Sequence, residues 1–181
     1  MQSWNPWHGC HKISEGCQNC YVYRTDSRYG KDSGKIEKTS NFDMPLNRDR
    51  SGEWKLQNDG FAVATCLTSD FFIDEADQWR SDIWQIIKRR RDLDFFIITK
   101  RIHRFYEGLP EDWGNGYDNV IIGCTCECQR TADFRLPIFL EAPIKHKVIV
   151  CAPLIEEINL SEYLNEQIEQ VSAGGESGEN A

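Results

Sequence analysis

After Gly60 the chain repeats one pattern, in which a short apolar run is followed by a longer polar or amphipathic stretch. The runs occupy residues 61–66, 95–99, 120–125, 148–151 and, more weakly, 170–173, and their starts are 22 to 34 residues apart. Short, partly β-branched runs of this kind are typical of strands buried on both faces of a sheet. Strands at this spacing, with room for helices between them, predict repeated βα units, a parallel sheet and an α/β fold.

The predicted helices lie between these runs. The clearest covers residues 77–91, where Trp79, Ile83, Ile86 and Ile87 share one face and four cations at 88–91 end the segment. Further helices are expected at residues 101–107, 131–140 (interrupted by Pro137) and 155–168, and a sixth strand near residues 3–7. A complete eight-stranded βα barrel takes about 250 residues. A chain of 181 residues therefore predicts a partial, TIM-like (β/α)6 barrel.

The length favours a single domain over residues 1–181, with a loop-rich region at 1–60 and βα repeats at 61–181. An aromatic content of 12% excludes a wholly disordered chain. The apolar runs are too short to cross a membrane, and the N-terminus does not have the pattern of a signal peptide. These features predict a cytoplasmic protein. Its eight cysteines should then be reduced, which favours metal or redox chemistry over a disulfide framework.

The net charge of −8 is unevenly distributed. Residues 151–181 contain seven Glu and no Lys or Arg, so nearly all of the excess negative charge belongs to that stretch. The acidity therefore leaves open an anionic partner for the remainder of the chain. The basic run at 88–91 is the one feature that favours nucleic acid, and a helix end explains that run equally well.

Cys10, Cys17 and Cys20 form a C-x6-C-x2-C cluster within a segment that also contains Gly9 and Gly16. Three thiolates on one loop can surround a single soft metal centre, and glycines allow the backbone to turn around it. An iron–sulfur cluster would use three cysteines and keep one iron free. Zinc is the alternative centre, because His8 or His11 could supply a fourth ligand.

Polar residues follow most of the predicted strands. Asp70, Lys100, Glu127, Cys151 and Glu176 each lie at or just past a strand end, and in parallel βα folds these ends form the ligand-binding edge. The pair Lys100–Arg101 can bind a carboxylate or a phosphate. Cys124, Cys126 and Cys128 alternate with Glu127, so they should pack away from the site as small apolar side chains.

Two motifs carry a resemblance to a known family. The chain reads W-N-P-W-H-G-C at residues 4–10 and S-E-G-C-Q-N-C-Y at 14–21, and further blocks follow in order at 68–70, 98–101, 123–127, 151–154 and 174–178. This series resembles a phage- and prophage-associated family of unknown function whose members are regarded as radical-SAM-like. The blocks span nearly the whole chain.

The resemblance implies a [4Fe–4S] cluster on Cys10, Cys17 and Cys20, with S-adenosylmethionine bound at its open iron. It implies an external electron donor and reductive cleavage to a 5′-deoxyadenosyl radical. The residues expected to contact the cofactor or substrate are Tyr21, Asp70, Glu127, Gly174, Gly175 and Glu176. The substrate stays open among nucleotides, nucleic-acid bases, peptides and small metabolites.

Departures from the expected patterns keep other functions open. The usual radical-SAM motif is C-x3-C-x2-C with an aromatic residue just before the last cysteine, whereas here the first gap is six residues and Asn19 occupies that position. Ala152 stands where the resembling family often has Glu. A degenerate, inactive relative is therefore one alternative, and a zinc-binding, non-enzymatic module associated with nucleic acid is another. The family continues beyond the point at which this chain stops at residues 178–181, so C-terminal truncation is also expected.

Overall fold

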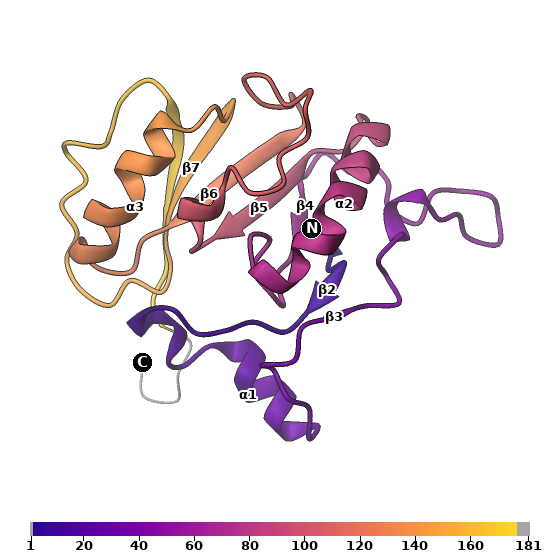
Figure 1. Cartoon of the computed structure of the whole chain (residues 1–181), viewed down its shortest axis with the longest axis horizontal. Coiled ribbons are helices and arrows are strands. Elements are labelled where there is room, and N and C mark those ends of the chain that lie inside the picture. The colour runs from indigo at the N-terminus through magenta and orange to yellow at the C-terminus, as the bar shows by residue number, and fades with distance from the viewer. Residues whose placement is uncertain (1, 177–181) are drawn as a thin grey trace.

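Six parallel strands form one sheet in the computed structural model, which describes residues 2–176 (Figure 1). The strands are β1 (Ser3–Trp4), β4 (Val63–Thr65), β5 (Phe95–Thr99), β6 (Val120–Thr125), β7 (His146–Cys151) and β8 (Ile168–Ala173). Their order in the sheet is the order in which they occur in the chain, and every neighbouring pair is parallel. Over residues 2–176 the sheet is open, with β1 and β8 at its edges. The predicted α/β fold with a parallel sheet is confirmed.

Two long helices connect the central strands. Helix α2 (Asp77–Arg89) lies between β4 and β5, and helix α3 (Gln129–Glu141) lies between β6 and β7 (Figure 1). Because the strand order never reverses, right-handed crossovers place these connections on the same side of the sheet. Side chains of both helices share one core with Phe95, Ile97 and Ile122 of the covered face.

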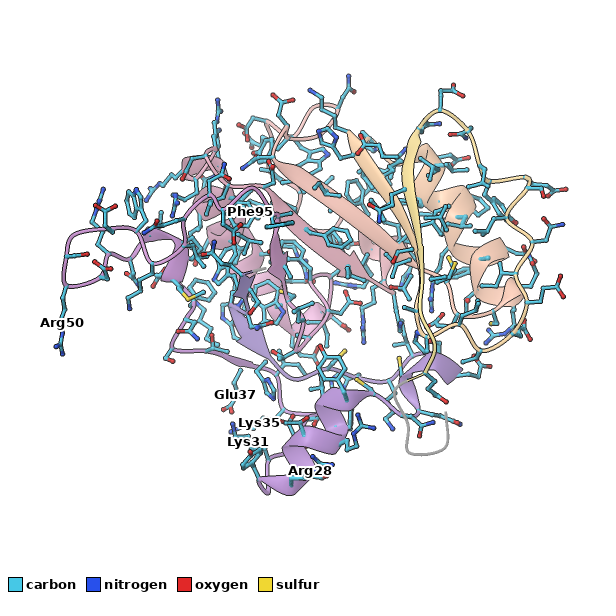
Figure 2. The ribbon with its side chains drawn as sticks, turned by 180° about the vertical axis from the view of Figure 1, so that it is seen from behind. Arg28, Lys31, Lys35, Glu37, Arg50 and Phe95 are labelled. Carbon is cyan, nitrogen blue, oxygen red and sulfur yellow. The ribbon has the colours of Figure 1, made fainter. Side chains whose placement is uncertain are left out.

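The opposite face of the sheet is less buried. Phe96, Ile98 and Ile121, which alternate with the core residues of β5 and β6, are half-exposed. Seen from behind, the strands lie in front of α3 (Figure 2). One face of the sheet is thus covered by helices, while the other is partly open over its central strands.

The first 60 residues contain more structure than their composition predicts. Helix α1 (Tyr21–Arg28) follows the cysteine cluster, and the short strands β2 (Trp7–His8) and β3 (Glu37–Lys38) pair antiparallel. Trp4 and Trp7 are fully buried, and Trp4 lies 5.6 Å from Phe95 between ring centroids. The region is therefore anchored by aromatic packing against the sheet. Figure 2 labels Arg28 at the end of α1 and Lys31 and Lys35 in the segment that follows it.

Several predicted helices differ from the structure. Residues 155–168 contain no helix, because Asn159 and Asn165 each accept a hydrogen bond from the backbone amide two residues later, at 3.0 and 2.9 Å. Such local bonds compete with helical ones. The segment 101–107 keeps only a 3₁₀ turn at Ile102–Arg104, whereas α3 runs through Pro137 without a break. Further 3₁₀ turns lie at Glu15–Cys17, Met44–Leu46 and Asp74–Ala76.

Within residues 2–176, every helix is too short or too polar to cross a lipid bilayer. The truncation prediction concerns residues 178–181, which lie outside the described residues, as do Ser177 and Gly178 of the last motif block.

A fully buried arginine on α2 holds the segment that follows β4. Arg80 donates from Nε to the carbonyl of Phe71 at 3.1 Å and from Nη2 to that of Ile73 at 2.7 Å, and its Nη1 lies 2.5 Å from Oδ1 of Asp77. The guanidinium thus satisfies backbone carbonyls that would otherwise be buried without donors.

We expect Arg80→Met to lower the free energy of unfolding by about 3 kcal/mol, because it leaves the buried carbonyls of Phe71 and Ile73 without their donor and removes one of the two arginines that pair with Asp77. Urea denaturation followed by circular dichroism measures this. The matched control is Arg89→Met at an exposed position of the same helix, with an expected change under about 1 kcal/mol. Equal effects of the two substitutions would contradict this role.

Candidate functional site

The cysteine loop crosses the carboxyl ends of the central strands, below the sheet in Figure 1. The amide of Gly9 donates to the carbonyl of Thr68, beyond β4, at 3.1 Å. Arg101, beyond β5, donates from Nη2 to the carbonyl of His11 at 2.8 Å. The loop is therefore fastened to the edge of the sheet that carries ligands in parallel βα folds.

The three cysteines of the motif are half-buried and lie in one neighbourhood. Burial raises the pKa of Tyr23, and the thiolate charges of Cys10, Cys20 and Cys17 raise it further; the Tyr23 hydroxyl donates to the carbonyl of Cys10. Burial raises the pKa of the Cys10 thiol to about 11, although Arg101, with Nη1 3.6 Å from Cys10 Sγ, opposes that rise. Cys10 is thus protonated at neutral pH while no metal is bound.

The donor chemistry of this loop suits a soft metal, but its geometry is not that of a formed site. Within residues 2–176, no group of three or more His, Cys, Asp or Glu residues is arranged to hold a metal ion. His8 Nε2 lies 2.8 Å from Asp26, and His11 Nε2 lies 2.5 Å from Glu75. Metal binding would therefore require the loop to draw its thiols together, and both histidines are engaged elsewhere.

A cavity of about 270 Å³ lies beside the cysteines. It brings together five of the predicted site residues, Cys17, Cys20, Tyr21, Gly175 and Glu176, although more than 150 positions separate the two ends of this set. Lys100 and Gly16 also line it. Gly174 lies immediately before this lining, where its amide donates to the carbonyl of Cys151 at 3.0 Å. Cys10 lies outside the lining.

Glu127 joins the loop to the sheet. This fully buried carboxylate accepts a hydrogen bond from Ser14 Oγ at 2.6 Å, and it pairs with Arg135 Nη1 at 2.6 Å and Lys100 Nζ at 3.2 Å. Burial alone would raise the pKa of Glu127, but Lys100, Ser14 and Arg135 together hold that pKa below its ordinary value. Glu127 is ionised and acts as the anchor of the loop.

Asp70 is occupied by protein donors. Its Oδ1 accepts from Thr99 Oγ1 at 2.7 Å, its Oδ2 accepts from the amide of Lys100 at 2.9 Å, and Arg101 Nη1 lies 3.4 Å away. Asp70 lines neither the cavity beside the cysteines nor the larger one described next. The structure places it behind Arg101, where it orients the guanidinium that reaches Cys10.

A second cavity, of about 580 Å³, adjoins the first, and Lys100 lines both. Its lining includes Arg104, Arg130 and Arg135, none of which the sequence analysis singled out. The sequence contains one indication of Arg135. Glu127 is expected at the end of a buried strand, and a buried carboxylate needs a cation close by. Nothing in the local pattern indicates which of the following arginines supplies it.

The other five cysteines are buried and free. Cys124 and Cys126 lie in the core, and Cys128 is the N-cap residue of α3. Cys66 and Cys151 are buried as well. Their burial is the one expected for packing thiols.

We expect Gly16→Ala to destabilise the protein by about 1–3 kcal/mol, the usual cost of overpacking. A Cβ at Gly16 would lie 2.4 Å from Cγ of Glu127, a side chain held by three partners and unable to move aside. The control is Gly175→Ala, where a Cβ meets no described atom within 4 Å. Thermal melts of both variants measure the difference, and two unchanged melting temperatures would refute the close contact.

We expect Glu127→Gln to cost about 3 kcal/mol at pH 7, because Lys100 and Arg135 lose the charge that compensates them. The folded pKa is lowered, so this stabilisation is complete above the unfolded pKa of about 4.3 and is lost as pH falls through the folded value. Denaturant titrations between pH 7 and pH 2 should show the difference from wild type shrinking. Glu141→Gln, at an exposed position of α3, serves as the control. A pH-independent difference would rule out an ionised anchor.

Comparison with known proteins places the whole chain in one family. No curated protein and no solved structure shows a significant match to it. Residues 1–181 match a family described as "Protein of unknown function (DUF5131)". The match covers the cysteine loop, the βα repeats and the Gly-Gly-Glu segment together. The chain therefore belongs to the DUF5131 family, whose function is unknown.

Proposed function

We propose that this protein is a radical S-adenosylmethionine enzyme, with a [4Fe–4S] cluster on Cys10, Cys17 and Cys20 and S-adenosylmethionine in the adjacent 270 Å³ cavity. One observation carries the proposal. Cys17 and Cys20, from the start of the chain, and Gly175 and Glu176, from its end, line the same cavity at the carboxyl edge of the sheet. S-adenosylmethionine must contact both the cluster and the residues that bind its amino acid group, so it needs a cavity that both sets of residues line.

The residues around the cavity offer a complementary partner for each part of the cofactor. The carboxylate of Glu176 can accept hydrogen bonds from the ammonium group, and Lys100 can pair with the carboxylate. Gly175 has no side chain in the way of a close approach. Tyr21 supplies an aromatic wall in place of the residue missing at Asn19, and its hydroxyl is fixed by donation to the carbonyl of Leu67.

Arg101 and Glu127 position the cluster loop without touching the cofactor. Arg101 brings a positive charge to Cys10 Sγ, which favours the thiolate that a metal requires. Glu127 holds Ser14 and closes tightly on Gly16 between the first two cysteines. When bound, a reduced cluster would supply the electron that cleaves the sulfur–C5′ bond of S-adenosylmethionine into methionine and a 5′-deoxyadenosyl radical. The electron would come from an external one-electron donor.

The strand order supports the same proposal. Successive strands added in one direction, with connections on one side, are the arrangement of βα barrels, and six of them would make a partial barrel whose inner face is the less buried one. Eight free cysteines suit a reducing compartment such as the cytoplasm. A phage-associated role belongs to this proposal through the resemblance of the opening motif.

The cluster is tested by anaerobic reconstitution with iron and sulfide. We expect about four iron and four sulfide per chain, a brown protein, and loss of both in the Cys10→Ala/Cys17→Ala/Cys20→Ala variant. Cys128→Ser is the control, because serine is a favoured N-cap residue and Cys128 lies outside the loop. Stoichiometric zinc in a colourless protein would overturn the cluster and favour a zinc-binding module.

Binding of the cofactor is tested by isothermal titration of S-adenosylmethionine into the reconstituted protein. Glu176→Gln should weaken binding about tenfold, the loss expected for one charge-assisted hydrogen bond. Glu162→Gln, on an exposed turn, is the control. Formation of 5′-deoxyadenosine under dithionite distinguishes an active enzyme from a degenerate relative that binds the cofactor without cleaving it.

A further inference from the structure

The 580 Å³ cavity beside the proposed cofactor site is strongly basic. Among residues 2–176, its lining includes one carboxylate, that of Asp74, and five cationic side chains, those of Lys100, Arg101, Arg104, Arg130 and Arg135. A cavity of this size accommodates a ligand of about nucleotide dimensions. The positive charge of the lining favours an anionic ligand.

The cations have carboxylate partners, but those partners are not among the described residues that line the cavity. The partners are Glu127, Asp70, Asp77 and Glu15, and among the described residues none of these four lines the cavity. Two are shared: Glu127 serves both Lys100 and Arg135, and Asp77 serves both Arg80 and Arg104. These ion pairs hold the cations at the wall of the cavity, as a preorganised anion site requires.

His103 also lines the cavity, and its pKa responds to the same positive charges. Burial lowers the pKa of His103, and the charges of Arg101 and Arg104 lower it further. Arg130 and Thr131, in the first turn of α3, line the same cavity, so the positive end of this 13-residue helix adds to the field. Phosphate is the anion that arginines and helix N-termini bind most readily.

The cavity also has an exposed aromatic wall. The Phe134 side chain is 57% exposed, although it lines the cavity, and its ring centroid lies 6.1 Å from that of His103. Ile13, also exposed, lines the cavity as well. An apolar ring set among cations is the combination that binds a nucleotide, because the base stacks while the phosphate pairs.

We propose that this cavity binds the substrate of the enzyme, and that the substrate is a nucleoside phosphate, either free or as a residue of a nucleic-acid strand. This inference deepens the proposed function and rests on it. Lys100, which lines both cavities, would mark the border between the substrate and the cofactor. The phosphate would lie against Arg104 and Arg130, and the base against Phe134.

The test measures binding of uridine 5′-monophosphate, uridine and inorganic phosphate to the full chain by isothermal titration, before any iron is loaded. A pyrimidine avoids the adenosine subsite of the proposed cofactor. We expect the monophosphate to bind at least tenfold more tightly than uridine and to weaken as salt rises. A 5′-phosphorylated oligouridine, bound more tightly than the monophosphate, would identify a strand as the source; weaker binding would identify the free nucleotide.

Two variants separate the parts of the ligand. Arg130→Gln, at an exposed ion pair, should weaken phosphate and the monophosphate about tenfold. Phe134→Ala should weaken the monophosphate by a similar factor and leave inorganic phosphate unchanged. Lys88→Gln, in a different cavity beside the amino end of β6, is the control and should change neither. Circular dichroism and melting temperatures establish that each variant is folded.

Equal affinity for uridine and its monophosphate, or unchanged binding in Arg130→Gln and Phe134→Ala, would overturn the proposal. So would the absence of binding by a folded wild-type chain. Because these titrations need no metal, their failure is distinguishable from failure of the cluster. Repeating them on the Cys10→Ala/Cys17→Ala/Cys20→Ala variant should give the wild-type affinity for the monophosphate.

Discussion

The position of the cysteine loop depends on one buried carboxylate. Glu127 is fully buried and is shared by Ser14 of the loop, Lys100 at the end of β5 and Arg135 of α3. A buried charge is tolerated only when paired, so the three partners must stay together for the carboxylate to remain ionised. Loop, sheet and helix are thereby held by a single group, and Gly16 is small because it packs directly on that group.

The two cavities follow from this anchoring. The loop lies across the carboxyl edge of the sheet. Its residues 11–14 contribute to the lining of the larger cavity, its residues 16–20 contribute to that of the smaller one, and Lys100 lines both. One opening gathers thiols, glycine and a carboxylate, whereas the other gathers arginines and an exposed ring. A fold that adds strands in one direction offers a single edge for both, so a cofactor and a substrate placed there would be neighbours.

Much of the fold could be predicted from hydrophobic periodicity. The bounds of β5 and β6 match their apolar runs, and α2 begins at the predicted residue. The same periodicity wrongly predicted a helix at residues 155–168. The side chains of Asn159 and Asn165 accept backbone hydrogen bonds there and form turns instead. Helix α1 was missed because its polar sequence stands among loop residues. Asp70 illustrates the limit for sites: strand position predicted a ligand contact, but protein donors surround its carboxylate.

By itself the sequence determined the α/β class, the parallel order of strands and the set of polar residues at their ends, because burial of short apolar runs and the period of each element are local properties. Only the tertiary structure decided which of those polar residues meet. Glu176 lines the same cavity as Cys17 and Cys20, whereas Glu127 accepts from Ser14 and pairs with two cations. The basic cavity could not be predicted from the sequence for the same reason. Its arginines are scattered along two connections, and charge accumulates in one place only when the chain has folded.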